Sequence, residues 1–290
     1  MTAVEQVTEP LAAHGEGPVW HPDWPGPRWV DMLAGDVLEI DGGTGRVSRH
    51  HVGEVAAALR PCTDGGVVLA LRRGFALAEA DLTGVRALGD LWSGPAVRMN
   101  DGDCDPDGRF YCGSMAYDET PGAGRLYRLD ADGSTTVVLR GVTISNGLAW
   151  SPDGGTAYYV DTPTQQVDAF DYDAAGLTGR RTLVRVPKAD GAPDGLTVDA
   201  NGNLWIALWG GGAVRCYHPD GRLLEHLPLP VSQVTACTFG GPNLDELYIT
   251  TSRQGVAPDS QPEAGALFRA RPGVRGQPAR CYRPRPGRTA

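Results

Sequence analysis

The sequence predicts an all-β fold, a six-bladed β-propeller with four antiparallel strands in each blade. The main observation is a turn signal of the Pro-Asp-Gly or Asn-Gly type that recurs six times, each time after a short apolar run. The recurring turn residues are separated by 41, 43, 46, 48 and 42 residues, and they are Asp23, Asp64, Asp107, Asp153, Asn201 and Asn243. The 40 glycines and 23 prolines suit many short strands joined by tight turns. Units of about 40 to 50 residues with several strands each are typical of propeller blades.

The strands of each unit can be placed in order from these turns. Each turn is followed by a run rich in strand-forming residues, at 28–32, 67–71, 110–115, 157–161, 204–208 and 246–251. A third strand and usually a second Asp/Gly turn follow, as in residues 36–43, 124–133 and 166–173. A fourth strand completes the unit, as at 134–139 and 181–186. We expect ring closure to pair an N-terminal strand near 4–8 with the last strands near 266–269, because closure removes exposed sheet edges.

We expect a single propeller domain over residues 1–290, with the Arg-rich residues 276–290 as a loose, solvated tail. The chain shows no linker that would divide it and no helical pattern. A pair of β-sandwiches with similar turns is the alternative, but a sandwich does not require even spacing over six units.

Composition excludes several function classes. The formal net charge is -9 at pH 7, which argues against a nucleic-acid binder, because phosphate contacts need clustered Lys and Arg. Residues 1–10 lack the basic and apolar regions of a signal peptide, and no apolar run reaches membrane-spanning length. The six cysteines are scattered without metal-binding spacing, so we expect reduced thiols and a cytoplasmic protein.

The turn register also predicts where polar side chains meet. Counting back seven residues from each turn reaches the start of each expected innermost strand, at Glu16, Ala57, Asn100, Asn146, Asp194 and Ala236. Innermost strands line the central channel of a propeller, so these ring positions should gather at one end of it. Four of the six carry carboxylate or carboxamide oxygens, which suit a hard cation such as Ca²⁺, Mg²⁺ or Mn²⁺. The alternative is that Asp and Asn stand here because they favour turns.

Two aromatic features are assigned to structure rather than to chemistry. Trp205 and Trp209 fall on one face of a predicted strand, so we expect both to pack in the core. His14 lies two residues before Glu16, but a lone His near a strand start is usually not catalytic, and we leave it out of the candidate site. No Gly-x-Ser-x-Gly nucleophile motif and no phosphate-binding loop accompanies these residues.

Short motifs follow one another along most of the chain. They are Glu16-Gly-Pro-Val-Trp, Arg98-Met-Asn-Asp-Gly with Gly113-Ser-Met downstream, Ser145-Asn-Gly-Leu-Ala-Trp-Ser-Pro-Asp and Pro193-Asp-Gly-Leu-Thr-Val-Asp. Together they resemble the SMP-30/gluconolactonase/regucalcin family. Two further motifs, Trp205-Ile-Ala-Leu-Trp-Gly-Gly and Phe239-Gly-Gly-Pro-Asn-Leu, resemble its bacterial sugar lactonases. One such motif would be weak evidence, but a series in this order is specific.

The resemblance implies a six-bladed propeller that holds one divalent metal ion at the channel mouth. It also implies the hydrolysis of a sugar lactone, an aldonolactone, to the aldonic acid. By motif position, the implied metal ligands are Glu16, Asn146 and Asp194. Ca²⁺ is the expected ion, with Zn²⁺, Mn²⁺ and Mg²⁺ as alternatives. The implied substrate-binding residues are Arg98, Asn100 and Asp118.

The chemistry of lactone hydrolysis gives these residues expected roles. A hard ion such as Ca²⁺ acidifies water less than zinc does, so a carboxylate base matters more. Asp194 is therefore the candidate catalytic residue, as metal ligand and proton acceptor together. Arg98 is expected to bind a ring oxygen or developing charge through its planar guanidinium, while Asn100 and Asp118 hold sugar hydroxyls. Asp118 is one methylene shorter than the Glu often found in this family, and the neighbouring Glu119 is the alternative acidic contact.

We expect a small-molecule sugar lactone as the partner, no nucleic acid and no membrane, and a monomer or weak homo-oligomer. Glucono-, xylono-, arabinono- and galactono-lactone all fit this expectation. Two other interpretations stay open: a related propeller hydrolase of phosphotriesters or other lactones, and a non-enzymatic calcium-binding propeller. The polar groups at Arg98, Asn100 and Asp118 favour the sugar, whereas a merely calcium-binding propeller would be indifferent to the loss of Arg98.

Overall fold

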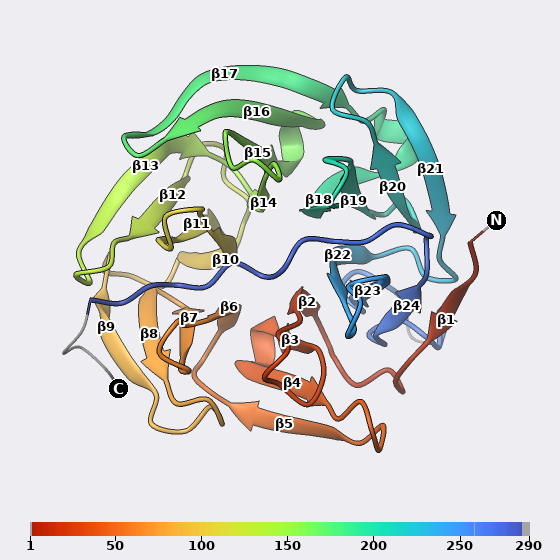
Figure 1. Cartoon of the computed structure of the whole chain (residues 1–290), viewed down its shortest axis with the longest axis horizontal. Helices are drawn as coiled ribbons and strands as arrows, with labels where there is room; N and C mark the ends of the chain where they lie inside the picture. The colour runs from red at the N-terminus through yellow and green to blue at the C-terminus, as the bar shows by residue number, and fades with distance from the viewer. Residues whose placement is uncertain (1, 258, 286–290) are drawn as a thin grey trace.

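The chain forms six four-stranded antiparallel sheets around a central axis, as the turn spacing predicts (Figure 1). The computed structural model describes residues 2–257 and 259–285. The sheets are the blades of a six-bladed β-propeller, so the predicted fold class is confirmed. Helix in the described residues is limited to three short 3-10 segments, η1 (Met32–Ala34), η2 (Thr162–Thr164) and η3 (Lys188–Asp190). In that same part of the chain, no helix has the length and apolar character needed to cross a membrane.

Blades 1 to 5 are each built from four consecutive strands. The strands of blades 1 and 2 are β2 (Gly15–Val19), β3 (Arg28–Asp31), β4 (Asp36–Ile40), β5 (Val47–His51), β6 (Ala56–Pro61), β7 (Val67–Leu71), β8 (Gly74–Ala78) and β9 (Arg86–Asp90). Those of blades 3 and 4 are β10 (Val97–Cys104), β11 (Phe110–Ala116), β12 (Gly124–Leu129), β13 (Thr135–Val142), β14 (Ser145–Trp150), β15 (Thr156–Asp161), β16 (Gln166–Asp173) and β17 (Gly176–Arg185). Those of blade 5 are β18 (Ala192–Val198), β19 (Leu204–Trp209), β20 (Ala213–Tyr217) and β21 (Leu223–Pro228).

Blade 6 closes the ring by joining the two ends of the chain. Its strands are β22 (Val234–Gly240), β23 (Glu246–Thr251), β24 (Phe268–Ala270) and β1 (Val4–Gln6). Strand β1 pairs antiparallel with β24, with Val4 opposite Ala270 and Gln6 opposite Phe268. This is the ring closure that the sequence predicts, and it gives the last blade four strands, as in the other blades.

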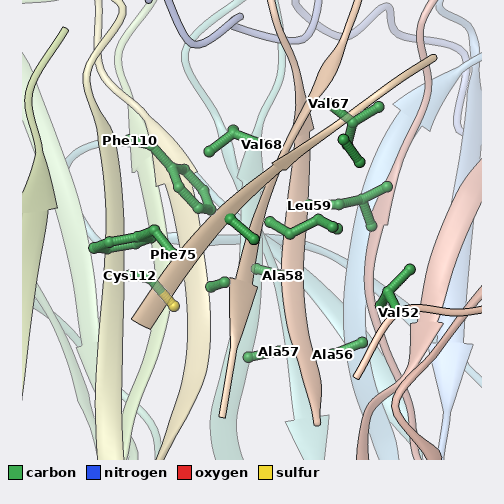
Figure 2. Close-up of a cluster of buried hydrophobic side chains, with 14 of the residues drawn as sticks. Val52, Ala56, Ala57, Ala58, Leu59, Val67, Val68, Phe75, Phe110 and Cys112 are labelled. Carbon is green, nitrogen blue, oxygen red and sulfur yellow. The ribbon is translucent and has the colours of Figure 1, made fainter. Parts of the chain in front are cut away.

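Burial decreases from the axis outward within each blade. Every residue of the innermost strand β14 is buried, whereas the outermost strand β9 is mostly exposed. The apolar core lies between neighbouring blades, where their faces pack together. Figure 2 shows one such cluster, in which Leu59 and Val68 of blade 2 lie near Phe75 and Phe110, whose ring centroids are 5.6 Å apart.

A C-terminal segment crosses one face of the propeller (Figure 1). We call residues 271–285 the C-terminal strap. The backbone N–H of Gly276 donates to Leu244 O, that of Tyr282 to Pro61 O, and that of Arg283 to Gly108 O, at 2.7, 2.8 and 2.8 Å. These carbonyls lie where innermost strands end, so the strap covers the end of the channel opposite to their starts. Within the tail expected at 276–290, residues 276–285 thus lie against the propeller, and 286–290 fall outside the described residues.

Candidate active site

A cavity of about 100 Å³ lies at the channel end where the innermost strands begin. Its polar side chains are Glu16, Arg98, Asn100, Asn146, Thr162 and Asp194, together with others described below. Four of the six predicted ring positions therefore meet in one cavity, supplied by β2, β10, β14 and β18. The other two ring positions, Ala57 on β6 and Ala236 on β22, are buried and bring no polar side chain.

A break in strand pairing accompanies the ring position in all six blades. In β14 the register shifts between Ser145 and Leu148, and in β18 it shifts between Pro193 and Leu196. The other four innermost strands carry an equivalent irregularity. A bulge of this kind bends a strand and redirects its side chains. The shared irregularity explains why residues with the same place in the repeat converge on the axis.

A glycine follows three of the ring residues, and crowding near the axis explains two of these glycines. A Cβ atom on Gly147 would lie 2.7 Å from Asp194 O, and one on Gly195 would lie 2.5 Å from Ala236 Cβ. Gly17 instead has a φ of 49°, which favours glycine. The Asn-Gly and Asp-Gly pairs are therefore a requirement of the narrow channel, and the Glu-Gly pair is a requirement of the local backbone conformation.

A chain of hydrogen bonds fixes the amides of the site. Arg98 Nη1 donates to Asn100 Oδ1 at 2.5 Å, and Asn100 Nδ2 donates to Asn146 Oδ1 at 2.8 Å. Asn146 Nδ2 donates to Thr162 Oγ1 at 2.8 Å, and the Thr162 hydroxyl donates to Pro193 O at 2.8 Å. Each bond sets the direction of the next, so the Asn146 amide has a defined orientation. Its Oδ1 accepts one hydrogen bond and keeps a lone pair for a ligand.

Burial dominates the electrostatics of the two ring carboxyl groups. It raises the pKa of Glu16 to about 8 and raises the pKa of Asp194 well above its ordinary value, and their mutual repulsion adds to the shift of Asp194. The carboxyl group of Asp101, also buried beside them, has its pKa raised to about 6 by burial. Burial lowers the pKa of the Arg98 guanidinium, although the nearby carboxylates favour its charge. The site thus concentrates acidic groups that are buried away from bulk water.

The donor atoms fit a hard divalent cation. Asp194 Oδ1 is buried without a hydrogen-bond partner, which is costly unless a ligand contacts it. Within the described residues, no three His, Cys, Asp or Glu side chains gather closely enough to hold a metal by themselves. A cation in this cavity would therefore need an amide oxygen beside the carboxylates of Glu16 and Asp194, and Asn146 Oδ1 is the amide oxygen of the predicted set. Carboxylate and amide oxygens are the ligands that Ca²⁺ and Mg²⁺ take in proteins.

The structure separates the two acidic candidates for substrate contact. Glu119 lines the cavity, and its φ of 56° places it in the left-handed region that non-glycine residues rarely adopt. Asp118 and Glu119 are both exposed, but Asp118 is not among the residues that line the cavity. Its Oδ1 accepts hydrogen bonds from the N–H and hydroxyl of Thr120 at 3.1 and 2.7 Å. Sequence reasoning named this pair of residues but could not choose between them.

His14 and Trp209 line the cavity although sequence reasoning left both out of the site. His14 is buried, and its ring meets the Trp209 ring edge-on with centroids 5.9 Å apart. The alternation of β19 correctly buries Trp205, whose Nε1 donates to Asp199 Oδ2 at 3.0 Å. Trp209 differs because it is the last residue of β19, at the cavity edge. Its place next to a glycine-rich turn was the signal that could have found it.

The fold and this oxygen-lined channel mouth define a propeller with a polar, metal-compatible central site. Residues 14–253 match the model of the SMP-30/Gluconolactonase/LRE-like region, so the chain belongs to this family. The chain is 35% identical over 288 residues to regucalcin of Danio rerio, covering 96% of this chain and 98% of that protein. It is 37% identical over 284 residues to the pentonolactonase XacC of Haloferax volcanii, covering 95% and 96%.

Solved structures agree with this assignment. The structure of a calcium-binding protein, regucalcin from Agrobacterium tumefaciens, superposes with a TM-score of 0.91 at 29% identity. The match covers 97% of this chain and 98% of that one. The family resemblance that the sequence motifs indicate is therefore confirmed.

Proposed function

We propose that this protein hydrolyses a sugar lactone, an aldonolactone, to the corresponding aldonic acid. The observation that supports the proposal most strongly is the meeting of Glu16, Asn146 and Asp194 with Arg98 and Asn100 in one buried cavity. The naming of a close relative as a pentonolactonase supports the same substrate class. The family motifs of the sequence give these residues the same division into a metal set and a substrate set.

The residues of the cavity have complementary roles in this reaction. A divalent cation held by Glu16, Asn146 and Asp194 would polarise the lactone carbonyl when bound. Asp194 would accept the proton of the attacking water, since its Oδ1 has no other partner. Arg98, buried and fixed by its bond to Asn100, would bind a lactone oxygen as negative charge develops.

The remaining polar groups would hold the sugar. Asn100 is oriented by three hydrogen bonds and would present its amide edge to a hydroxyl. Of the two acidic candidates, Glu119 is the one that lines the cavity, so we assign it the sugar contact expected of Asp118. Both are acceptor groups suited to a substrate rich in hydroxyls.

The proposed ion follows from the ligand atoms, and the proposed compartment follows from the state of the cysteines. Ca²⁺ is the ion we propose, because the ligands are all oxygen atoms and one relative is named a calcium-binding regucalcin. All six cysteines are free, which suits a reducing compartment such as the cytoplasm. We propose a monomer or a weak homo-oligomer.

The test is hydrolysis of glucono-, galactono-, xylono- and arabinono-lactone by metal-stripped protein. Ca²⁺, Mg²⁺, Mn²⁺ or Zn²⁺ is added back, and acid release is followed at constant pH. We expect a metal-restored activity that Asp194→Asn lowers by a factor of about 10² to 10⁴, the range of general-base catalysis. Asp153→Asn, on an exposed turn at the other end of blade 4, is the matched control and should keep full activity. Metal binding without hydrolysis of any lactone would refute the proposed function.

A further inference from the structure

Both the backbone and the imidazole ring of His14 are anchored by contacts within the protein. The backbone N–H of His14 donates to Asp31 Oδ1 at 3.0 Å, and its C=O accepts the N–H of Met32 at 2.9 Å. A β-bridge joins it to Ser252, across the junction of blades 1 and 6. The ring packs edge-on against Trp209. Such anchoring fixes the direction of the ring nitrogens before any ligand arrives.

The hydrogen bond of Nδ1 sets the tautomer. His14 Nδ1 and Ser252 Oγ are 2.7 Å apart, and Ser252 Oγ accepts the N–H of Gln254 at 2.9 Å. The other acceptor near this hydroxyl, Ala13 O, is 3.4 Å away and already accepts the N–H of Arg253 at 3.0 Å. The Ser252 hydroxyl therefore donates its proton to His14 Nδ1 rather than to Ala13 O. A neutral imidazole that accepts at Nδ1 carries its proton at Nε2.

The protonated Nε2 has no partner within residues 2–257 and 259–285, although the side chain is buried and lines the cavity. A nitrogen that carries a proton cannot ligate a metal, and His14 forms no metal-binding group with the carboxylates around it. Glu16, two residues further along the chain, belongs to the proposed metal-binding set, whereas His14 does not. The Nε2–H donor of His14 therefore remains available to another ligand.

The place of His14 in the ring shows which part of a ligand it can reach. His14 directly precedes β2 of blade 1 and bridges to Ser252 of blade 6, whereas Arg98 belongs to β10 of blade 3. The Arg98 guanidinium nevertheless reaches blade 1, because its Nη1 contacts Met32 Sδ at 2.9 Å, and the N–H of Met32 donates to His14 O at 2.9 Å. Both side chains line the cavity, so a sugar bound there meets the donor of His14 as well as that of Arg98, and only Arg98 belongs to the set that the family motifs indicate.

We propose that His14 is a substrate-contacting residue, whose Nε2–H donates a hydrogen bond to an oxygen of the bound sugar lactone. This inference rests on the proposed function and deepens it, because it adds a further recognition group to the cavity that Arg98 lines. Ser252 acts as a positioning residue, since its hydroxyl selects the tautomer that exposes the donor. No proton transfer by His14 is required.

Three substitutions of His14 distinguish this role from a packing role. The side-chain amide of Gln reaches about as far as Nε2, whereas that of Asn reaches only as far as Nδ1, and Phe fills the space without a donor. We expect H14F and H14N to lower kcat/KM about tenfold, the effect of one lost hydrogen bond, while H14Q stays within about threefold of the wild type. Ser252→Ala should give an intermediate loss. Melting temperature and Ca²⁺ affinity, measured in parallel, should change little in all four variants.

The outcomes separate this inference from the proposed function. Wild-type kcat/KM in H14F, or equal losses in H14Q and H14F, would overturn the donor role. Should the wild type hydrolyse none of the four lactones while binding Ca²⁺, the proposed function fails instead. Calorimetric binding of gluconate to the same variants then decides on His14: weaker binding by H14F and H14N than by H14Q supports the contact, and equal affinities refute it.

Discussion

Without a bound cation, the folded protein favours the protonated, uncharged form of the Glu16 carboxyl group. Burial raises its pKa from 4.5 to about 8, so the folded protein holds this proton more tightly than the unfolded chain does. The stabilisation that results is complete below pH 4.5 and disappears as pH rises through 8, because the buried carboxylate must then carry its charge. A cation bound beside it reverses this trend by compensating the charge.

The prediction at this scale concerns melting temperature as a function of pH. With a chelator present, we expect the melting temperature to fall between pH 5 and pH 8. Ca²⁺ at a fixed concentration about a thousandfold above its Kd at pH 8 should add about 4 kcal/mol at pH 8. It should add less at pH 5, where protonation of the carboxyl ligands weakens binding. Glu16→Gln should flatten the pH dependence of the chelated protein. A chelated wild type that gains stability with pH would contradict the argument.

Sequence reasoning placed side chains together where the repeat determines their position. Glu16, Asn146 and Asp194 occupy one place in three blades, and the structure brings them into one cavity. His14 was left out, and the choice between Asp118 and Glu119 stayed open, because these positions depend on other features. His14 is set by a contact with Ser252, 238 residues away, and Glu119 by a left-handed backbone conformation that its residue type does not announce.

At the scale of the element, the turns between the first and second strands of blades 3 and 5 contain a buried carboxylate acceptor. Asp199 is fully buried, and it accepts from the N–H groups of Asn201 and Asn203 at 2.9 Å and from Trp205 Nε1 at 3.0 Å. Asp105 has the same place in blade 3. In blades 3 and 5, the carboxylate two positions before the turn Asp or Asn therefore holds the turn that ends the first strand.

Asp199→Ala tests this role of the buried acceptor. The substitution leaves several N–H groups without a partner, so we expect the free energy of unfolding to fall by about 3 kcal/mol or more. Asp153→Ala is the control, because Asp153 is exposed and accepts only from Ser151 and Gly155. Its cost should be about 1 kcal/mol or less. Urea unfolding of both variants provides the comparison, and equal losses would show that the turn does not depend on its buried carboxylate.

At the scale of the whole molecule, the sequence repeat made the number of blades and the closing strand predictable. The position of the C-terminal strap does not depend on the repeat and could not be predicted from it. Residues 276–290 have an Arg-, Pro- and Gly-rich composition that indicates a solvated tail. Yet Thr63 N–H donates to Tyr282 O at 2.9 Å, and Gln277 Nε2 donates to Trp150 O and Val198 O at 3.1 and 3.2 Å. The acceptors of these hydrogen bonds are main-chain carbonyl oxygens, which a sequence pattern does not reveal. The strap thereby ties blades that are far apart in sequence.

Tyr282 is the anchor through which the strap stabilises the ring. Its ring is fully buried in the core between blades 2 and 3, and its hydroxyl donates to Asp130 O at 2.9 Å. We expect Tyr282→Ala to cost about 4 kcal/mol, as other large-to-small core substitutions do, and to lower the melting temperature by about 10 °C. Tyr282→Phe keeps the ring and should cost about 1 kcal/mol. Because the strap covers the channel end opposite to Asp194, kcat/KM at 25 °C should stay near the wild-type value in both variants. A large loss of activity with an unchanged melting temperature would mean that the strap acts on the site rather than on the stability of the ring.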